Sequence, residues 1–330
     1  MAKFILSKKQ VFEQLEIMKS LADEISYSFK SNPEIGKILQ DNCFLSIHSV
    51  NNLKQVNSKN VWFFLQGNKE IPKEVDNFVV DNINDLNLLL KEDRKINLLL
   101  RFRLREHTIH TGKHFVFGFS SKEINNLLPK LRNNKNIKQL GIHFHRKTQN
   151  VSEWNLKEEL EDSIEDFSLL DLVNIGGGIP AEYKNFRKEV SEHIFTKIKE
   201  LREFLNAKKI KMIIEPGRFI AAPSIRLETE VVNVYDNNII VDASVYNSAM
   251  DTFVANIRLL VEDEREKGFC YTIKGITPDS LDIFRYKVYF DKEVRVGDKI
   301  VFLNAGAYNF SSGYFNLENV ETEITDQTRQ

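Results

Sequence analysis

Two segments of the chain carry residues that could hold an anion and a charged ring. In Gly176-Gly177-Gly178, three successive residues without a Cβ would let backbone N–H groups approach an anion such as a phosphate. In the segment Glu215-Pro216-Gly217-Arg218, the carboxylate could pair with a cationic ring nitrogen, while the guanidinium could bind a phosphate through its forked donors. A flexible glycine turn and a surface Glu–Arg ion pair are the simpler alternatives.

Two further segments could supply an amine and an imidazole. Because side chains alternate along a strand, His143 and His145 would lie on one face, where they could bind a metal or one could stack on a flat ring. No third metal ligand lies at a suggestive spacing, so we expect no metal. Lys30 could form a Schiff base if an apolar pocket lowered its pKa, although a single lysine is more often a surface residue. An amine, an acid, a glycine cradle and a stacking imidazole are together the parts that a pyridoxal phosphate (PLP) site requires.

Each of these segments follows an apolar run of strand length, and the runs alternate with amphipathic segments. The predicted strands are 25–29, 43–47, 61–65, 78–80, 97–102, 139–145, 170–175 and 210–214. The predicted helices are 33–41, 50–56, 69–75, 83–92, 121–131, 152–167 and 181–205. Eight β/α alternations predict an α/β fold, a (β/α)8 TIM-like barrel, with an open doubly wound sheet as the alternative. Active groups of such a barrel follow the carboxyl ends of its strands, with phosphate after strands seven and eight.

The chain changes character after Pro223, where strands follow one another without long helices. We predict strands at 226–235, 239–241, 269–273, 283–290 and 299–303, and hence a mostly antiparallel β domain. The expected domains are a PLP-binding barrel over residues 7–222 and a C-terminal β domain over 223–330, to which residues 1–6 could add a strand.

Composition excludes several classes of protein. The 330 residues include 46 Lys and Arg against 47 Asp and Glu, which argues against a nucleic-acid or membrane-surface binder. Two cysteines, Cys43 and Cys270, exclude a disulfide framework and favour a reducing cytoplasm. The first apolar stretch is too short for a signal peptide, and no apolar run is long enough to span a membrane. We therefore expect a cytoplasmic enzyme that acts on a small molecule.

From about Phe4 to Leu317, the chain resembles the fold-type III PLP enzymes, specifically the ornithine, diaminopimelate and arginine decarboxylases. The resemblance rests on six segments in the family's order: 26–33, 140–145, 174–178, 214–218, 275–282 and 304–316. It implies that Lys30 holds PLP, that His145 stacks on the ring and that Glu215 contacts the pyridine nitrogen. It also implies cofactor contacts from Arg101, for which Arg103 is an alternative, and phosphate contacts from Gly176, Gly177, Gly178, Arg218 and Tyr308.

The segment 275–282 implies an assembly. In the family, this loop reaches into the active site of a neighbouring subunit, so the resemblance implies a homodimer with shared active sites. Pro278 stands where the family usually has a cysteine that handles the proton after CO2 loss, so that step needs another donor. The Gly-Ser that usually follows the stacking histidine is replaced by Arg146-Lys147-Thr148. Thr148 could still bind the phosphate, and the two cations could add positive charge near the site or solvate a rim.

The resemblance implies PLP-dependent decarboxylation of an amino acid to an amine or polyamine precursor, with Lys30, His145, Glu215 and Asp279 as catalytic residues. Asp279 matches an acid that binds the distal amine of ornithine, which favours a basic substrate: ornithine, lysine or arginine. Arg258 lies roughly where diaminopimelate decarboxylases bind a distal carboxylate, so diaminopimelate or a carboxy-polyamine stays open; Tyr308 is a further substrate contact. An amino-acid racemase is a rival, as is a non-catalytic homologue that resembles antizyme inhibitors. Pro278 favours the non-catalytic homologue, and the retained cofactor residues argue against it.

Overall fold

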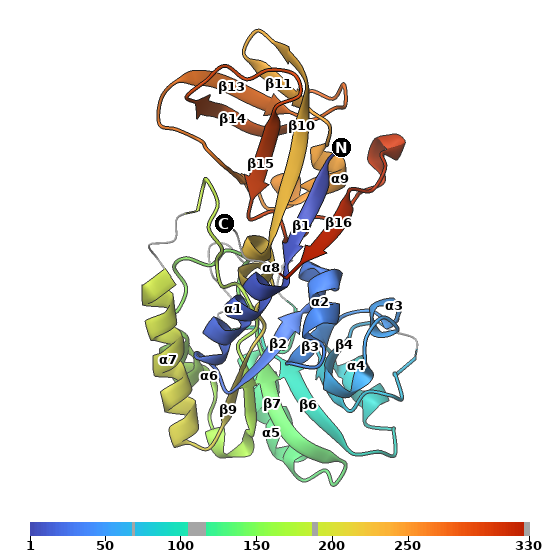
Figure 1. Ribbon diagram of the computed structural model, residues 1–330. Coiled ribbons are helices and arrows are strands. Elements are labelled where there is room, and N and C mark those ends of the chain that lie inside the picture. Colours follow the sequence, from blue (N-terminus) through green and yellow to red (C-terminus); the bar gives the residue numbers. More distant parts are fainter. Residues whose placement is uncertain (68–69, 105–116, 187–190, 327–330) are drawn as a thin grey trace. The chain divides into compact units, whose positions relative to one another are not determined.

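The computed structural model describes residues 1–67, 70–104, 117–186 and 191–326 (Figure 1). The chain forms two compact units. The barrel unit comprises Glu16–Ile179 and Val190–Gly217, and the β unit comprises Met1–Leu15, Pro180–Glu189 and Arg218–Gln330. Within the described ranges, no helix has the length and apolar composition needed to cross a membrane.

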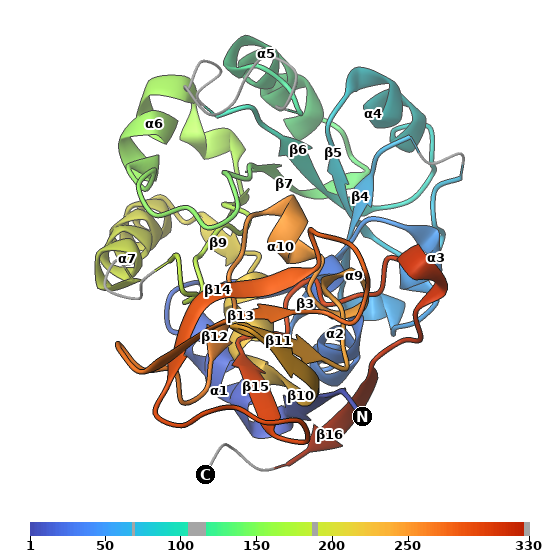
Figure 2. The same ribbon diagram turned by 90° about the horizontal axis from the view of Figure 1, so that it is seen from above.

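A closed barrel of eight parallel strands forms the barrel unit. The strands are β2 (Glu24–Ser28), β3 (Phe44–Ile47), β4 (Val61–Leu65), β5 (Asn77–Val80), β6 (Ile96–Arg101), β7 (Ile137–His143), β8 (Leu172–Asn174) and β9 (Lys211–Ile214). Strand β9 pairs with β2, which closes the barrel. The helices are α2 (Pro33–Leu39), α3 (Val50–Leu53), α4 (Ile83–Leu89), α5 (Ser121–Arg132), α6 (Leu156–Ser163) and α7 (Ser191–Ala207), with short 3-10 turns η1 (Phe29–Ser31), η2 (Ser58–Asn60) and η3 (Phe167–Leu169). Figure 2 shows α4 to α7 on the outside of the strands.

Local sequence explains where several of these helices begin. The Ser120 side chain accepts from the backbone N–H of Glu123, whose carboxylate accepts from the Ser120 backbone N–H, so a capping box starts α5. Asn32 accepts from two backbone N–H groups at the start of α2, and Pro33 takes the first helical position, where a missing N–H costs nothing. Asn82 caps α4 by accepting from the backbone N–H of Asp85.

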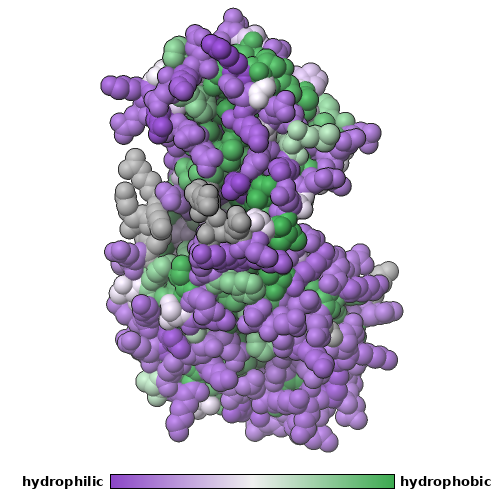
Figure 3. Space-filling view, viewed as in Figure 1, coloured by the Kyte–Doolittle hydropathy of each residue, from purple (hydrophilic) through white to green (hydrophobic). Residues whose placement is uncertain are grey.

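The barrel is filled by large apolar side chains from several strands. Trp62, Phe64, Val79, Leu99, Leu172 and Ile213 form one buried cluster. At Gly141 in β7, a Cβ would lie 2.2 Å from the carbonyl oxygen of Leu172, so only glycine allows β7 and β8 to pack this closely. On the face drawn in Figure 3, hydrophilic residues cover most of the outer surface of the barrel unit.

All eight predicted barrel strands are present, which confirms the predicted fold class. The helix predicted at 69–75 is wrong over the described residues 70–75, where Pro72 lacks the N–H that a helix interior needs. The helix predicted at 152–167 is shorter, because Asn150 and Trp154 form a turn before α6 begins at Leu156. Likewise, residues 181–186 form a bridge between Tyr183 and Phe186 rather than a helix.

The β unit is a mostly antiparallel sheet whose strands run in the order β12-β15-β10-β11-β13-β14. Its elements are β1 (Lys3–Ser7), β10 (Ile225–Tyr235), β11 (Asn238–Val241), β12 (Leu260–Val261), β13 (Phe269–Lys274), β14 (Ile283–Phe290), β15 (Lys299–Leu303) and β16 (Glu321–Thr325), with helices α8 (Arg218–Ser224), α9 (Val245–Ser248), α10 (Asp251–Val254) and η5 (Tyr314–Asn316). Strand β1 pairs antiparallel with β10 and parallel with β16, and helix α1 (Lys8–Lys19) follows it. Stacked rings of Phe284 and Phe302, 4.7 Å apart, lie in the core of the unit.

Candidate active site

Glu215 is the centre of a buried polar group at the carboxyl end of the barrel strands. It follows β9 directly and is 6% exposed. Asn174, the last residue of β8, donates from Nδ2 to Oε1 of Glu215 at 2.8 Å. His143, the last residue of β7, is 1% exposed, and its Nε2 lies 3.3 Å from Oε2 of Glu215. Three neighbouring strands therefore converge on one carboxylate.

These contacts keep Glu215 charged. Burial alone raises the pKa of Glu215, but His143 and the hydrogen bonds from Ser46 and Asn174 outweigh it and lower that pKa below the ordinary value. Desolvation lowers the pKa of His143, so its imidazole is neutral at neutral pH and donates from Nε2 to the carboxylate. The His143 Nδ1 atom is then an acceptor, and it is buried without a hydrogen-bond partner among the residues that the structure describes.

Two more imidazoles lie near this carboxylate. The His48 ring stacks on Phe64 at 4.3 Å, and the edge of Phe64 meets the His143 ring at 5.0 Å. Burial and then the positive charge of Lys30 lower the pKa of His48 to about 4. His145 is solvent-accessible, and its Nδ1 accepts from the backbone N–H of Gly177 at 3.1 Å. Desolvation, followed by Lys30, lowers the pKa of His145 as well, so these rings are neutral at neutral pH.

The glycine triplet after β8 has no room for side chains. A Cβ on Gly176 would lie 2.4 Å from the carbonyl oxygen of Phe144, and one on Gly177 would lie 2.6 Å from that of Glu215. Gly176 and Gly178 have φ of +67° and +89°, in the region that disfavours other residues. The loop therefore presents bare backbone beside Glu215 and His145, as the predicted phosphate cradle requires.

Lys30 lies in η1, immediately after β2. Phe29 and Ser31 take the buried positions of η1 and the Lys30 side chain is exposed, so the residues that the structure describes provide no apolar pocket around the amine. Arg101 ends β6, and its guanidinium lies 5.5 Å from the centre of the Phe117 ring. Desolvation lowers the pKa of Arg101, with the charges of Asp81 and Glu215 acting in the opposite direction.

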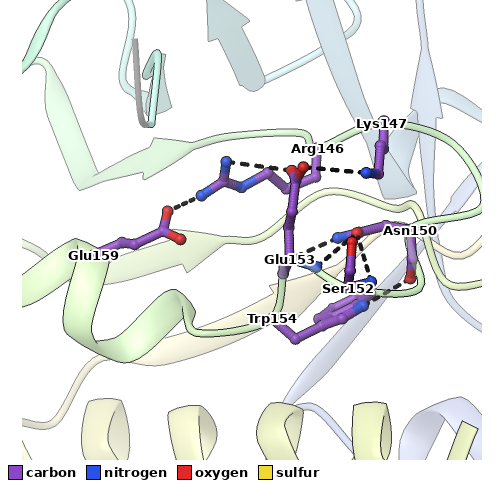
Figure 4. A network of polar contacts seen from close by, with 7 residues as sticks. All are labelled: Arg146, Lys147, Asn150, Ser152, Glu153, Trp154 and Glu159. Atoms are coloured by element: carbon purple, nitrogen blue, oxygen red, sulfur yellow. Dashed lines mark hydrogen bonds and ion pairs between the residues drawn. The ribbon is translucent and has the colours of Figure 1, made fainter. Parts of the chain in front are cut away.

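Arg103, the alternative to Arg101, lies 3.7 Å from Glu123 at the start of α5. Thr148 is exposed in the loop that follows β7. Both expectations for Arg146, a solvated residue at the rim of the site and an added positive charge near it, are wrong. Arg146 is buried and forms an ion pair with Glu159 of α6 (Figure 4).

Arg218 and Tyr308 come together in the β unit. The buried Arg218 guanidinium forms an ion pair with Asp251, donates to the Tyr183 hydroxyl at 3.2 Å and lies over the Tyr308 ring at 5.1 Å. Burial lowers the pKa of Arg218, but Tyr183 and Asp251 outweigh burial and raise it. Burial raises the pKa of Tyr183 to about 12. The sequence does not predict Asp251 or Tyr183 as partners of Arg218, because neither residue lies in a recognisable motif.

Asp279 lies in the loop between β13 and β14. Its Oδ2 accepts from the Tyr246 hydroxyl at 2.7 Å, and its Oδ1 accepts from the backbone N–H of Leu281 at 2.8 Å. These two hydrogen bonds, the backbone one first, lower the pKa of Asp279. Arg258 lies in the loop before β12, half-buried, and its Nη1 has no hydrogen-bond partner within the described ranges.

Sequence reasoning also missed His48 as a site residue. Its signal was its position, one residue beyond the predicted strand 43–47, where a barrel places active groups. For His143 the sequence suggests half of a metal pair or a stacking ring, and not a hydrogen bond to Glu215. Among the described residues, no three His, Cys, Asp or Glu side chains are grouped to hold a metal ion.

The residues of the barrel unit fit pyridoxal phosphate. The glycine triplet leaves space that any Cβ would fill, and the buried carboxylate of Glu215 is held charged, as a partner for a protonated ring nitrogen must be. The His143 Nδ1 atom is a buried acceptor without a partner in the described part of the chain. An amine at the end of β2 completes the donor set.

Residues 66–222 match the family model described as "Pyridoxal-dependent decarboxylase, pyridoxal binding domain". The chain is 26% identical over 285 residues to the diaminopimelate decarboxylase of Aquifex aeolicus, covering 78% of this chain and 67% of the relative. It is 24% identical over 302 residues to the ornithine decarboxylase of Candida albicans, covering 74% of this chain and 62% of the relative.

Solved structures agree on the fold. The lysine/ornithine decarboxylase of Vibrio vulnificus, solved with putrescine, has a TM-score of 0.80 at 18% identity, covering 99% of this chain and 94% of that one. The lysine decarboxylase of Selenomonas ruminantium has a TM-score of 0.77 at 19% identity, covering 99% and 93%. Residues 66–222 are thus similar to the pyridoxal binding domain of pyridoxal-dependent decarboxylases, and the solved structures show the same fold over nearly the whole chain.

Proposed function

We propose that the protein is a PLP-dependent decarboxylase of a basic amino acid. The observation that carries this proposal is the charged Glu215 at the end of β9, which accepts hydrogen bonds from Asn174 and His143 and lies beside a glycine loop without side chains. The family and the names of relatives, which include ornithine and lysine/ornithine decarboxylases, support it. When bound, pyridoxal phosphate supplies an electron sink that stabilises the charge left on Cα as CO2 departs.

Each residue of the barrel unit then has a distinct task. The Lys30 amine would hold the cofactor's aldehyde carbon, and the Glu215 carboxylate would keep a proton on the ring nitrogen by electrostatic attraction. His145, neutral and fixed by Gly177, would stack on the ring, while Gly176 and the rest of the triplet would bind the phosphate through backbone N–H groups. Arg101, Thr148, Arg218 and Tyr308 remain predicted cofactor contacts.

Asp279 supports a substrate with a distal amine. Its carboxylate is charged and accessible in a surface loop, and a carboxylate pairs with an ammonium group. The alternative, a substrate with a distal carboxylate, rests on Arg258, whose buried Nη1 has no partner in the described ranges. Diaminopimelate decarboxylases also occur among the relatives, so we favour the basic substrate on the charged Asp279 carboxylate together with the relatives named for ornithine, lysine and arginine.

We also propose a homodimer with shared sites. Beside Asp279, the ring of Tyr246 contacts Phe253, Tyr314 and Phe315 at centroid distances of 5.1, 5.1 and 5.4 Å. The last three side chains are exposed, and an exposed aromatic group of this kind is typical of a protein interface. Mixing Lys30→Ala with Asp279→Ala subunits should restore about a quarter of wild-type sites if sites are shared. No recovery in mixtures that exchange subunits would argue for self-contained sites.

A cytoplasmic location is likewise proposed, supported by the free thiols of Cys43 and Cys270.

Reconstitution tests the function directly. Purified protein with PLP should absorb at about 420 nm. Borohydride should then attach the cofactor covalently to Lys30 in the wild type, and no such attachment should occur in Lys30→Ala. Release of CO2 should be measured with ornithine, lysine, arginine and diaminopimelate, and amino-acid chirality should be followed in parallel. We expect CO2 from a basic substrate. Racemisation without CO2 would overturn the decarboxylase, and a protein that stays colourless would favour the non-catalytic homologue.

A further inference from the structure

The loop between β7 and α6, residues 144–155, forms a group of four charged side chains with Glu159 of α6 (Figure 4): Arg146 and Glu159 are buried, and Lys147 and Glu153 are half-buried. Arg146 is 7% exposed and forms an ion pair with Glu159 of α6, which is 5% exposed. Nη1 of Arg146 also lies 3.7 Å from Oε2 of Glu153. The Lys147 Nζ donates to the other oxygen of Glu153 at 3.1 Å. Two positive and two negative residues therefore balance one another.

The polar backbone of this loop fixes where Glu153 lies. Asn150 Oδ1 accepts from the backbone N–H of Glu153 at 3.0 Å, and Asn150 Nδ2 donates to the Glu153 carbonyl oxygen at 2.9 Å. The Trp154 indole N–H donates to the Asn150 carbonyl oxygen at 2.7 Å. Figure 4 shows these contacts on the side of Glu153 that faces away from Glu159. Glu153, which pairs with Arg146, is thus part of a turn that is closed by hydrogen bonds.

The same loop lies directly against the glycine triplet. The Gly177 N–H donates to His145 Nδ1, and the Asn150 N–H donates to the Gly178 carbonyl oxygen at 2.8 Å. A Cβ on Gly178 would lie 2.8 Å from the carbonyl oxygen of Lys147, so the two backbones are in contact. A shift of the loop at Arg146 would therefore displace both His145 and the triplet.

We propose that Arg146 is a positioning residue for the cofactor site. Its guanidinium, held by Glu159 and Glu153, ties the residue next to His145 to helix α6 and so keeps His145 and the glycine triplet in place. A buried ion pair adds little net stability, but removing one partner leaves an uncompensated buried charge, which forces the surrounding loop to rearrange. The inference rests on the proposed function only in taking PLP as the bound group.

Amide hydrogen exchange on the protein without cofactor tests the loop itself. The variants are Arg146→Met and Glu159→Gln, which each remove one charge at nearly constant size. The matched control is Arg202→Met, which also removes an arginine from an ion pair. Arg202 Nε donates to Asp23 Oδ1 at 2.7 Å, and Asp23 directly precedes β2, so this pair lies at the opposite end of the strands from the site. We expect the amides of Gly177 and Asn150 to exchange faster in both test variants and not in the control. Equal acceleration of all amides would indicate loss of global stability and would overturn the proposal.

Cofactor affinity provides the second readout. The PLP dissociation constant, measured by absorbance titration, should rise about tenfold or more in each test variant, as misplacement of supporting groups typically causes. The double variant should be no worse than the singles, because both residues act as one unit. Unchanged PLP affinity and unchanged Gly177 exchange in Arg146→Met would overturn the proposal. If wild-type protein bound no PLP, the proposed function would fail, and the exchange of Gly177 would still decide the role of Arg146.

Discussion

Asn174 couples the Glu215 carboxylate to the glycine loop. Its Nδ2 donates to Oε1 of Glu215 at 2.8 Å, and its Oδ1 accepts from the backbone N–H of Gly176 at 2.9 Å. Turning the amide would break both hydrogen bonds, so one side chain sets the direction of the carboxylate and the course of the loop. A buried carboxylate needs such donors to stay charged.

Replacing Asn174 with Asp should turn this attraction into repulsion. Two buried carboxylates in contact cannot both ionise easily, so the pKa of one of them rises in the folded state. A group whose pKa is raised on folding binds more protons in the folded state, so its stabilising effect is present at low pH and lost as pH rises.

The free energy of unfolding of Asn174→Asp, relative to wild type at the same pH, should therefore fall from pH 4 towards pH 7 by about 1–3 kcal/mol. Urea unfolding at several pH values measures it, and Asn174→Ala is the control, because it lacks a donor but adds no charge. A loss independent of pH in Asn174→Asp would show that charge repulsion is not its cause.

The site's main elements could be predicted because the barrel strands are buried on both faces. Such strands appear as continuous apolar runs, as in Val61–Leu65, and their ends mark where Glu215 and the glycine triplet must lie. Strand β16 escaped prediction because Glu321–Thr325 is largely exposed and polar. Strand β12 has only two residues, Leu260 and Val261, which is too short for a periodic signal.

Ion-pair partners could not be predicted, since they depend on how loops fold. Arg146 and Glu159 are separated by a turn whose shape depends on Asn150. Arg218 and Asp251 lie 33 positions apart. A sequence shows which residues are charged, but not which distant acid forms an ion pair with a given arginine. The sequence therefore predicts Arg146 as a cation near the site or at its rim, and not as a buried ion pair. The exposure of Lys30 could not be predicted for a related reason: which residues of η1 are buried, here Phe29 and Ser31, depends on tertiary packing.

His48 should make the folded protein sensitive to mild acid. Its pKa of about 4 in the folded state lies below the ordinary value of about 6.5, so the unfolded state binds the proton more readily between these values. The stabilising effect is complete above pH 6.5 and is lost as pH falls towards 4. His48→Phe keeps a ring on Phe64 and removes this titration.

The measured quantity is the difference in unfolding free energy between wild type and His48→Phe at each pH. It should shift in favour of the variant by at most about 3 kcal/mol on going from pH 7 to pH 4, since one pKa unit is worth about 1.4 kcal/mol. A difference that is constant across this range would contradict a half-buried His48 that stays neutral down to about pH 4.

Gly178 and Gly297 make a matched pair for testing the cradle. Their φ angles are +89° and +92°, so alanine is strained similarly at both positions. A Cβ at Gly178 would lie 2.8 Å from the carbonyl oxygen of Lys147, whereas one at Gly297 would meet nothing within 4 Å. Gly178→Ala should therefore lose about 1–3 kcal/mol more than Gly297→Ala, because of overpacking. Thermal unfolding measures the loss, and only Gly178→Ala should weaken PLP binding. Equal effects of the two substitutions would mean that the contact with Lys147 is easily relieved.

Asp282 should stabilise the loop that carries Asp279. Asp282 is 1% exposed and accepts hydrogen bonds from the Ser244 hydroxyl at 2.9 Å, the Val245 N–H at 2.8 Å, and the Thr277 N–H and hydroxyl at 3.1 and 2.7 Å. Asp282→Asn would turn an amide NH2 towards some of these donors and leave them unpaired, at a cost of about 1–3 kcal/mol in unfolding free energy.

Asp279→Asn provides the contrasting variant, because Asp279 is a surface residue that accepts only from Tyr246 and Leu281 in the described structure. It should leave the unfolding free energy unchanged and raise KM for a basic substrate, since a neutral amide cannot attract a distal ammonium group. Urea unfolding and steady-state kinetics separate the two effects: loss of stability in Asp282→Asn, loss of substrate affinity in Asp279→Asn. If Asp279→Asn left KM for the basic substrate unchanged while Asp282→Asn destabilised the fold, the loop would be structural and the distal amine would have to bind elsewhere.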